Sequence, residues 1–376
     1  MFKKSHVLFL AVLAMCAVLP ARSSAETTNA AGAVFVMTNA ADQNEIIAYQ
    51  RRADGSLQEG RSFRTGGRGS GGVTDPLGSQ GSLTLSQDHS LLFAVNAGSG
   101  EISVFRVHGA NLSLTDNVPC GGSEPVAVAQ HGSLVYVVNA GAASNVVGFR
   151  LEDEGTLKQI PDSLAFLSTG NAGASSLAIS PDGQFVLVTE KLTNSIDAFQ
   201  VRPDGTLARI VVNPSVGPGL FSVLFAPNGT ALATETGPAG GNNASAISSY
   251  TVHADGTLSA ISASVPTSGA ATCWHAITPD GHFVFTSNAG SATVSGFVIG
   301  ANGALTPVGG TIIGINPAGS TNLDLAISAD GKFLYTLDSG TGRVSVFGIN
   351  QDGTLNNLGE VGGLTASAGF NGIAAI

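Results

Sequence analysis

The stretch ASSLAISPDGQFVLVTEKLTNSIDAFQVRPDGTLAR, residues 174–209, carries the pattern that decides the fold of this chain. It contains four short runs rich in Val, Ile, Phe and Thr, separated by a Pro-Asp-Gly turn, a polar loop and an Asp-Gly turn. Runs of this kind with this punctuation predict antiparallel strands joined by hairpins. The stretch therefore predicts one small four-stranded sheet, and its pattern recurs along almost the whole sequence.

The turn before the fourth strand occurs seven times. Its copies are Asp54-Gly-Ser-Leu57, Asn111-Leu-Ser-Leu114, Glu154-Gly-Thr-Leu157, Asp204-Gly-Thr-Leu207, Asp255-Gly-Thr-Leu258, Asn302-Gly-Ala-Leu305 and Asp352-Gly-Thr-Leu355. The leucines are 57, 43, 50, 51, 47 and 50 residues apart, a spacing that fits four-stranded propeller blades and exceeds most helical repeats. The sequence thus predicts an all-β chain in which residues 33–376 form a single domain, a seven-bladed β-propeller.

The turn before the second strand occurs only six times, from Ser86-Gln-Asp-His89 to Ser328-Ala-Asp-Gly331. The missing copy belongs to the first unit, which starts directly at Val34 with no strand before it. The C-terminal segment, residues 370–376, aligns with residues 321–327, which begin the last unit. We therefore predict that this segment is the innermost strand of blade one, so that the two chain ends seal the ring and remove exposed sheet edges.

The first 25 residues have the features of a secretory signal peptide. Lys3 and Lys4 precede an apolar run from Val7 to Leu19, and small residues precede a cleavage point after Ala25. Residues 26–32 then form a short N-terminal segment. No later run approaches the roughly 20 apolar residues that a membrane helix needs. We expect a secreted or periplasmic protein without a membrane span, and we predict a monomer.

Charge and cysteine content limit the possible partners. Loss of the signal peptide would change the formal net charge from −10 to −13, which argues against nucleic acid as a partner. Cys120 and Cys273 lie three repeat units apart, so the repeat pattern does not favour a disulfide between them.

Oxygen-bearing residues stand at the end of every second strand. They are Asn39, Asn96, Asn139, Glu190, Glu235, Asn288 and Asp338. Turn chemistry accounts for Asn and Asp at such positions, but Glu190 and Glu235 are poor turn formers. Because they belong to adjacent blades, these two carboxylates near a channel mouth could act as base and acid. Alternatively, the same ring could bind a hard cation such as Ca²⁺, although the sequence otherwise suggests no cofactor and no metal.

Two further groups of residues are candidates for the site. Cys273-Trp274-His275 begins an innermost strand, where Trp274 could be a stacking platform and His275 could be either catalytic or packed between blades. Asp324 begins the next innermost strand. A Gly-rich insertion, residues 60–74, carries Arg61, Arg64 and Arg68, which could bind an anion or could simply lie in a solvated loop.

The seven units, the Ser-Pro-Asp-Gly and Asp-Gly-Thr-Leu turns and the phrase Tyr136-Val-Val-Asn-Ala140 resemble the seven-bladed β-propeller lactonase family. This family includes 6-phosphogluconolactonases and 3-carboxymuconate cyclases, and the resemblance covers residues 33–376. The resemblance implies that the ligand is a small lactone or a carbohydrate-like molecule. Family enzymes carry a Gly-Pro-Arg-His stretch before a Ser-Pro-Asp-Gly turn, and no blade of this chain retains it. A family habit of Asn-Glu at the end of a second strand is partly kept as Thr189-Glu190 and Thr234-Glu235.

Two hypotheses follow. In the first, the protein is an exported lactonase-like hydrolase, a carboxylic-ester hydrolase that opens a small lactone or cyclic ester at the loop-bearing mouth of the channel. Glu190 or Glu235 would activate water, and His275 or an arginine of the 60–74 insertion would stabilise the oxyanion. The substrate contacts would come from Arg61, Arg64, Arg68, Trp274, Asn139, Asn288, Asp324 and Asp338. In the second hypothesis, the propeller is not catalytic and binds a glycan, a peptide or a cell-surface component.

Overall fold

The computed structural model describes residues 1–2, 30–239 and 241–376, and these residues form strands, turns and loops but no helix. The predicted signal peptide lies almost wholly outside the described residues, as does Cys16 within it. The described chain contains no helix that is long and apolar enough to cross a membrane. The first strand begins at Ala30, three residues before the predicted domain boundary.

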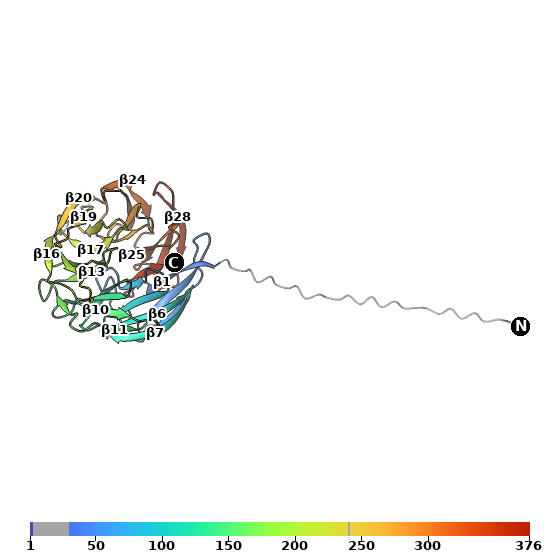
Figure 1. Ribbon diagram of the computed structural model, residues 1–376. Coiled ribbons are helices and arrows are strands. Elements are labelled where there is room, and N and C mark those ends of the chain that lie inside the picture. The colour runs from blue at the N-terminus through green and yellow to red at the C-terminus, as the bar shows by residue number, and fades with distance from the viewer. Residues whose placement is uncertain (3–29, 240) are drawn as a thin grey trace.

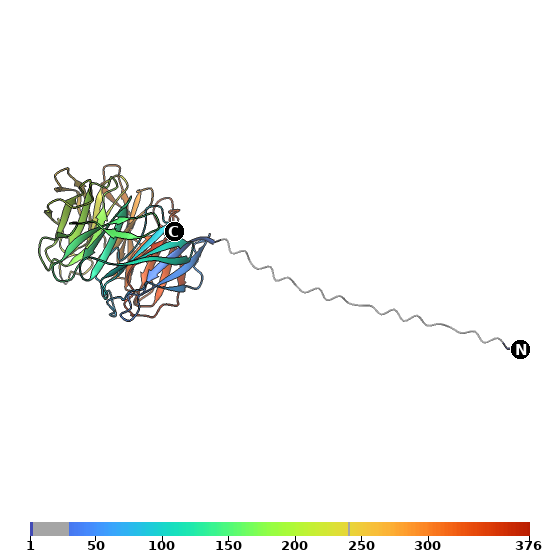
Figure 2. The same cartoon turned by 60° about the horizontal axis from the view of Figure 1, so that its bottom comes forward.

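Seven antiparallel sheets stand around a central axis, as Figures 1 and 2 show, and each sheet is one blade of a β-propeller. Blade 1 consists of β1 (Ala30–Met37), β2 (Glu45–Arg52), β3 (Arg61–Arg64) and β29 (Ile373–Ala375); blade 2 of β4 (Leu83–Leu85), β5 (Leu91–Asn96), β6 (Glu101–His108) and β7 (Asn111–Pro119). Blade 3 consists of β8 (Pro125–His131), β9 (Leu134–Asn139), β10 (Asn145–Leu151), β11 (Leu157–Gln159) and β12 (Ala165–Phe166); blade 4 of β13 (Ala174–Ile179), β14 (Phe185–Glu190), β15 (Ser195–Gln200) and β16 (Val211–Pro214).

The remaining three blades have the same four-stranded order. Blade 5 consists of β17 (Leu220–Phe225), β18 (Ala231–Glu235), β19 (Ala246–Val252) and β20 (Leu258–Pro266); blade 6 of β21 (Thr272–Ile277), β22 (Phe283–Asn288), β23 (Thr293–Ile299) and β24 (Leu305–Ile315); blade 7 of β25 (Asn322–Ile327), β26 (Phe333–Asp338), β27 (Arg343–Ile349) and β28 (Leu355–Val361). Only blade 3 departs from the predicted pattern, because its outermost strand is split into β11 and β12, which both pair with β10.

The ring is closed as the sequence predicts. Strand β29 pairs antiparallel with β1, with Ala375 opposite Val34 and Ile373 opposite Val36. In Figure 1 the C-terminus accordingly lies beside β1. Blade 1 therefore combines both ends of the described propeller in one sheet.

The repeated turn motifs owe their residue types to local hydrogen bonds. In the Asp-Gly-Thr turn, Asp204 Oδ1 accepts hydrogen bonds from Thr206 N (2.9 Å) and Thr206 Oγ1 (2.7 Å). Gly205 has a φ of 88°, which only glycine adopts without strain, and its carbonyl accepts a hydrogen bond from Tyr136 Oη of the preceding blade (2.8 Å). The turn thus fixes its own shape and also ties neighbouring blades together.

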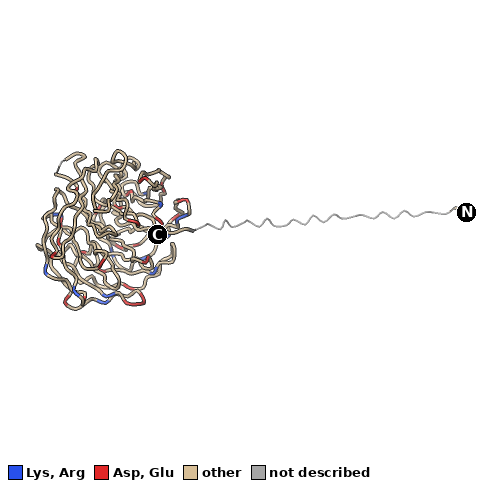
Figure 3. Tube along the Cα trace, turned by 45° about the horizontal axis from the view of Figure 1, so that its top comes forward, with Lys and Arg blue, Asp and Glu red and all other residues tan. Residues whose placement is uncertain are grey.

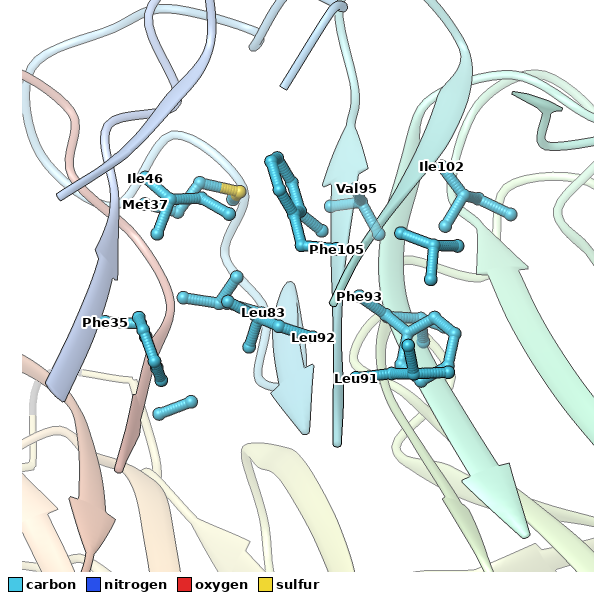
Figure 4. Packing of buried hydrophobic residues seen from close by; sticks show 14 of the residues in the cluster. Phe35, Met37, Ile46, Leu83, Leu91, Leu92, Phe93, Val95, Ile102 and Phe105 are labelled. Carbon is cyan, nitrogen blue, oxygen red and sulfur yellow. The ribbon is translucent and has the colours of Figure 1, made fainter. Parts of the chain in front are cut away.

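Apolar side chains from adjacent blades fill the space between them. Figure 4 shows Phe35 and Met37 of blade 1 facing Leu83 and Leu92 of blade 2, and all four are buried. Full burial of a side chain of this size contributes roughly 1.5–3 kcal/mol. Charged residues make up only 11% of the chain, and they are few and scattered in the view of Figure 3.

The connection from blade 1 to blade 2 is unusually long. It runs through residues 65–82, whereas residues 120–124 are enough to connect blades 2 and 3. The predicted loop at residues 60–74 is partly wrong, because residues 61–64 form the outermost strand of blade 1 and pair with β2. The extra length of the connection lies further along, in residues that enter the centre of the ring.

Candidate active site

The seven oxygen-bearing residues at the ends of the second strands do form a repeated feature, but their side chains lie inside the blades. All seven have at most 1% of their surface exposed: Asn39, Asn96, Asn139, Glu190, Glu235, Asn288 and Asp338. In several blades the side chain bonds a serine of the third strand. Asn96 Nδ2 donates to Ser103 Oγ (2.7 Å), and Asn288 Nδ2 donates to Ser295 Oγ (2.8 Å). Most of these residues brace their own blades, whereas Asn39 bonds Ser70 in the connection to blade 2; the sequence interpretation missed this role.

Glu190 and Glu235 are both fully engaged in such bracing. Glu235 accepts hydrogen bonds from Ser248 Oγ (2.6 Å) and Ser264 Oγ (2.7 Å). Glu190 accepts hydrogen bonds from Ser168 N (2.8 Å) and Ser168 Oγ (2.5 Å), and a third from Thr193. Their role as a catalytic pair stays a prediction, since the structure places both carboxylates in the interior of separate blades with no exposed surface.

Blade 4 has an aspartate, Asp197, where other blades carry the bracing serine. Neither of its carboxyl oxygens meets a donor, and neighbouring Glu190 is itself an acceptor, so their contact is a hydrogen bond only if one carboxyl is protonated. Burial, together with the hydrogen bond and the charge of Glu190, raises the pKa of Asp197 to about 9. Burial also acts to raise the Glu190 pKa, but hydrogen bonds from Asp197, Ser168 and Thr193 outweigh it and lower this pKa. At neutral pH the proton therefore resides on Asp197.

This buried acid makes folding depend on pH. Because the folded pKa of Asp197 exceeds that of an aspartate in an unfolded chain, its contribution to stability is complete below about pH 4 and is lost as pH rises towards 9. We expect Asp197→Asn, which keeps a donor towards Glu190, to make the free energy of unfolding decline less steeply between pH 5 and pH 9. For one proton the difference in slope is at most about 1.4 kcal/mol per pH unit. Urea titrations at pH 5, 7 and 9 measure it, with Asp42→Asn as the exposed control; identical slopes in wild type and Asp197→Asn would refute the shared proton.

The other predicted contacts from the second strands are also buried. Asn139 Nδ2 donates to Asn145 Oδ1 (2.9 Å), and Asn288 Oδ1 accepts from Thr272 Oγ1 (2.5 Å). Asp338 accepts hydrogen bonds from Asn316 Nδ2 (2.8 Å) and from Ser345, and burial raises its pKa to about 7. Their predicted role as substrate contacts has no support in this arrangement, because none of the three presents exposed surface.

Trp274 and His275 line the centre of the ring but are covered. Trp274 is 1% exposed, so it is not an open stacking platform, and its Nε1 donates to Ser79 O (2.8 Å). His275 is fully buried, with Nδ1 hydrogen-bonded to Ser222 Oγ (2.9 Å) and Nε2 without a partner. Burial lowers the His275 pKa to about 3, so the ring is neutral at physiological pH. This agrees with the interpretation of His275 as a residue packed between blades.

The three predicted anion-binding arginines are exposed, but they do not form a common site. Arg61 donates to Asn111 of blade 2 at the rim of the propeller and lies over the Phe63 ring. Arg64 belongs to the same outer strand, and the backbone of Arg68 bonds the hairpin of blade 2 through Ser99. The arrangement places Arg61 and Arg64 on a strand at the edge of blade 1 instead of in a flexible loop.

The long connection between blades 1 and 2 crosses the centre of the ring. We call residues 75–82 the crossing segment. It touches blade 3 through Ser79 Oγ, which donates to Val126 O (2.9 Å), and blade 4 through Gln80 N, which donates to Ser175 O (2.8 Å). On blade 6, Gln80 Nε2 donates to His275 O (2.6 Å) and Gln80 Oε1 accepts from His275 N (3.2 Å). Because these blades stand on different sides of the axis, the segment closes the channel.

The crossing segment divides the channel into two ends. On the face that carries the tight turns, a cavity of about 350 Å³ ends at Gln80 and is also lined by Thr84, His131 and Ser176. On the loop-bearing face, the segment itself supplies Asp75. The functional side chains at that end come from the crossing segment and from the loops that surround it.

Asp75 and Lys191 both bond the backbone of one residue of the crossing segment, Gly78. Asp75 Oδ1 accepts hydrogen bonds from Gly78 N (3.0 Å) and from Asn371 Nδ2 (3.0 Å), and Lys191 Nζ donates to Gly78 O. The Lys191 ammonium also lies 5.3 Å from the centre of the Phe221 ring. Asp75 and Lys191 form no direct ion pair, so each retains part of its hydrogen-bonding capacity.

Both charges are partly removed from water. Burial raises the pKa of Asp75 to about 6, although the charge of Lys191 and two hydrogen bonds act to lower it. Burial lowers the pKa of Lys191, and the charge of Asp75 opposes that change. A carboxyl group that titrates near neutrality beside an ammonium group is a typical arrangement for proton transfer combined with oxyanion stabilisation. The sequence offered little signal for this pair: Lys191 simply follows Glu190, and Asp75 lies in a connection without a repeat equivalent.

Asp324 approaches this pair from blade 7. Its carboxylate accepts hydrogen bonds from Leu325 N (2.9 Å) and Ile373 N (3.1 Å). Burial and, to a lesser extent, the charge of Asp75 raise the pKa of Asp324 to about 7. With 3% of its surface exposed, Asp324 acts on the pair through its charge and ties the closing strand β29 to blade 7.

Cysteines and possible metal ligands complete the description. Cys120 and Cys273 are both buried free thiols. Within the described parts of the chain, no three His, Cys, Asp or Glu side chains gather in a way that could hold a metal ion.

Comparisons with known proteins agree with this architecture. The sequence matches the family described as "Lactonase, 7-bladed beta-propeller" over residues 29–168, 127–234 and 222–369. Among solved structures, the periplasmic gluconolactonase of Pseudomonas aeruginosa, PpgL, is 18% identical with a TM-score of 0.69, and the match covers 92% of this chain and 98% of that one. A Bacteroides uniformis protein with a provisional assignment as a 6-phosphogluconolactonase is 19% identical with a TM-score of 0.67, covering 92% of this chain and 99% of that one.

A search of curated proteins gave no match. The solved structures share so little sequence with this chain that they establish the fold alone. The family match is instead a match of the sequence itself, and its three overlapping segments extend from residue 29 to residue 369. The chain therefore belongs to the seven-bladed β-propeller lactonase family.

Proposed function

We propose that this protein is an exported lactonase-like hydrolase that opens a small lactone at the loop-bearing end of its channel, with Asp75 as general base and Lys191 as oxyanion stabiliser. One observation carries the assignment. In a propeller of the lactonase family, the half-buried carboxyl group of Asp75 and the half-buried ammonium group of Lys191 both bond Gly78 of the crossing segment. The family supports lactone hydrolysis in general, and the pair supplies the two groups that this reaction needs.

The reaction follows from the chemistry of the two side chains. The Asp75 carboxylate takes a proton from water while the water oxygen attacks the lactone carbonyl carbon. Lys191 Nζ, which spends one of its three N–H groups on Gly78 O, directs another to the carbonyl oxygen as it becomes negatively charged. The ring C–O bond then breaks, and protonated Asp75 returns its proton to the leaving alkoxide. The product is the open hydroxy acid, and the enzyme returns to its starting state.

Export is part of the proposal because of the basic start and apolar run in residues 1–25. N-terminal sequencing of the protein recovered from the periplasm or medium would check it, and a mature chain that starts after Ala25 is the expected result. Recovery of the intact chain from the cytoplasm alone would contradict it. We also propose that the mature protein is a monomer, which light scattering would test.

The pH dependence of turnover tests the assignment of the base. Because only the carboxylate form of Asp75 accepts a proton, kcat/KM for a neutral lactone such as δ-valerolactone should rise with pH through a midpoint of about 6. Because burial lowers the Lys191 pKa, kcat/KM should fall again at a more acidic pH than an exposed lysine would give. Proton release measured between pH 4 and pH 9, with spontaneous hydrolysis subtracted, gives the profile. A rate independent of pH between 5 and 7 would refute Asp75 as the base, and absence of any turnover would favour a propeller that only binds its ligand.

A further inference from the structure

The charges around Asp75 and Lys191 are unbalanced. Among the described residues, Lys191 is the one basic side chain whose charge acts on the pKa of Asp75. Two more carboxyl groups adjoin this pair: exposed Glu124, whose charge acts on the pKa of Lys191, and buried Asp324, whose pKa Asp75 raises. One ammonium group therefore stands among three carboxyl groups.

No arginine corrects this imbalance. Among the arginines that the structure describes, Arg61 bonds Asn111 at the rim and the Arg68 backbone bonds the hairpin of blade 2, and none contributes to the pKa shifts of Asp75 or Lys191. A phosphate or carboxylate group on a substrate is normally held by arginine or by several cationic groups. Here such a group would meet mainly negative charge in partly desolvated surroundings, where repulsion is stronger than in bulk water.

Two exposed apolar residues are close in sequence to the same pair. Leu192 follows Lys191 directly and is 66% exposed, and Val73, two residues before Asp75, is 67% exposed. Beneath Lys191, the Phe221 ring packs edge-on against Trp274 with centroids 4.9 Å apart. An alkyl substituent on the substrate would remove exposed apolar surface from water here, whereas a charged substituent would find no partner.

We propose that this site selects uncharged lactones with an apolar substituent and discriminates against phosphorylated or carboxylated lactones. The inference rests on the proposed function, because it specifies the substrate class of the same site. A lactonase for sugar phosphates would need cationic groups that are free to bind the phosphate. In this chain Lys191 already donates to Gly78 O, and the charges of acidic groups act on it.

Four lactones test the proposal: δ-valerolactone, its 5-pentyl derivative, glucono-1,5-lactone and the 6-phosphate of glucono-1,5-lactone. We expect kcat/KM to be highest for the pentyl derivative and at least tenfold lower for the 6-phosphate than for glucono-1,5-lactone. Added salt should reduce the difference in kcat/KM between glucono-1,5-lactone and its 6-phosphate, because salt screens the repulsion of the anionic substrate. Turnover of the neutral lactones with equal or better turnover of the 6-phosphate would overturn the inference and leave the proposed function standing. Absence of turnover for all four would instead overturn the proposed function.

Two pairs of variants separate the charge effect from the apolar effect. Glu124→Gln should raise the ratio of kcat/KM for the 6-phosphate to kcat/KM for δ-valerolactone several-fold, whereas Glu154→Gln in an exposed turn of blade 3 should leave this ratio unchanged. Leu192→Ser should lower the ratio of kcat/KM for the pentyl derivative to kcat/KM for δ-valerolactone several-fold, with Val212→Ser on β16 as the exposed control. If Glu124→Gln leaves its ratio unchanged, the proposed charge effect is wrong. If Leu192→Ser leaves its ratio unchanged, the proposed apolar effect is wrong.

Discussion

Replacement of Asp75 by asparagine is expected to lower kcat/KM for δ-valerolactone by about 10²–10⁴-fold, the usual contribution of a general base. Asparagine retains an acceptor for Gly78 N and Asn371 Nδ2, so the crossing segment should stay in place while the proton acceptor is lost. Steady-state rates together with thermal unfolding measure the two consequences separately. A variant with normal unfolding and normal turnover would remove Asp75 from the mechanism.

Matched variants make this result specific. Lys191→Met should reduce kcat by about 10²–10³-fold, because a preorganised oxyanion donor is lost. Asp42→Asn and Lys332→Met alter exposed residues outside the proposed pair and should leave turnover unchanged. The double variant Glu190→Gln/Glu235→Gln distinguishes the Asp75 site from the glutamate site. We expect it to remain active. A loss of turnover without a loss of stability would show that these glutamates are catalytic.

Deletion of residues 370–376 is expected to prevent the propeller from forming a stable ring. The deletion removes buried Phe370 and Ile373 and leaves Val34 and Val36, both without exposed surface in the intact protein, at an open edge of blade 1. Loss of the two large apolar side chains costs roughly 1.5–3 kcal/mol each, and unpaired buried backbone groups cost about 1–3 kcal/mol each. The sum is comparable to the whole stability of a typical domain, about 5–15 kcal/mol.

Since the truncated protein is expected to be insoluble or unfolded, a graded series is needed beside it. Ile373→Val should cost about 0.5–1.5 kcal/mol, as this substitution usually does in a core, and Ile373→Asp should cost far more because it buries a charge beside Asp324. Thr365→Ala, in the exposed connection before β29, is the control. Urea unfolding measures the series, and a truncated protein with wild-type stability would contradict closure by β29.

The fold could be predicted almost completely from the sequence because its determinants are local. Asp204 and Thr206 make the hydrogen bonds of their turn within three residues, and this turn recurs at a nearly constant spacing. The closure by β29 followed from counting, since one copy of the inner strand was missing at the start and present at the end.

The site was harder to predict because its contacts are not local. Gln80 bonds His275, which is 195 residues away, and Asp75 bonds Asn371 across 296 residues. The connection that carries Asp75 and Gln80 has no equivalent in the other blades, so the repeat pattern could not indicate its path. The sequence indicated only that the connection between blades 1 and 2 is longer than the others.

The second-strand residues show the opposite situation. The sequence showed correctly that these residues recur in every blade. They recur because most of them form hydrogen bonds within their own blade, not because they form a site. Asn96 and Ser103, like Asn288 and Ser295, are seven residues apart and bond within one blade. This spacing was present in the sequence and could have indicated that Glu190 faces Asp197 within blade 4.

The most direct test of the account is a crystal structure of the protein with δ-valerolactam, a lactone analogue whose ring nitrogen resists hydrolysis. The account predicts that its carbonyl oxygen lies within about 3 Å of Lys191 Nζ, with the carbonyl carbon facing the Asp75 carboxylate. Lactam bound only in the turn-face cavity lined by Thr84 and His131, with Lys191 uncontacted, would contradict it.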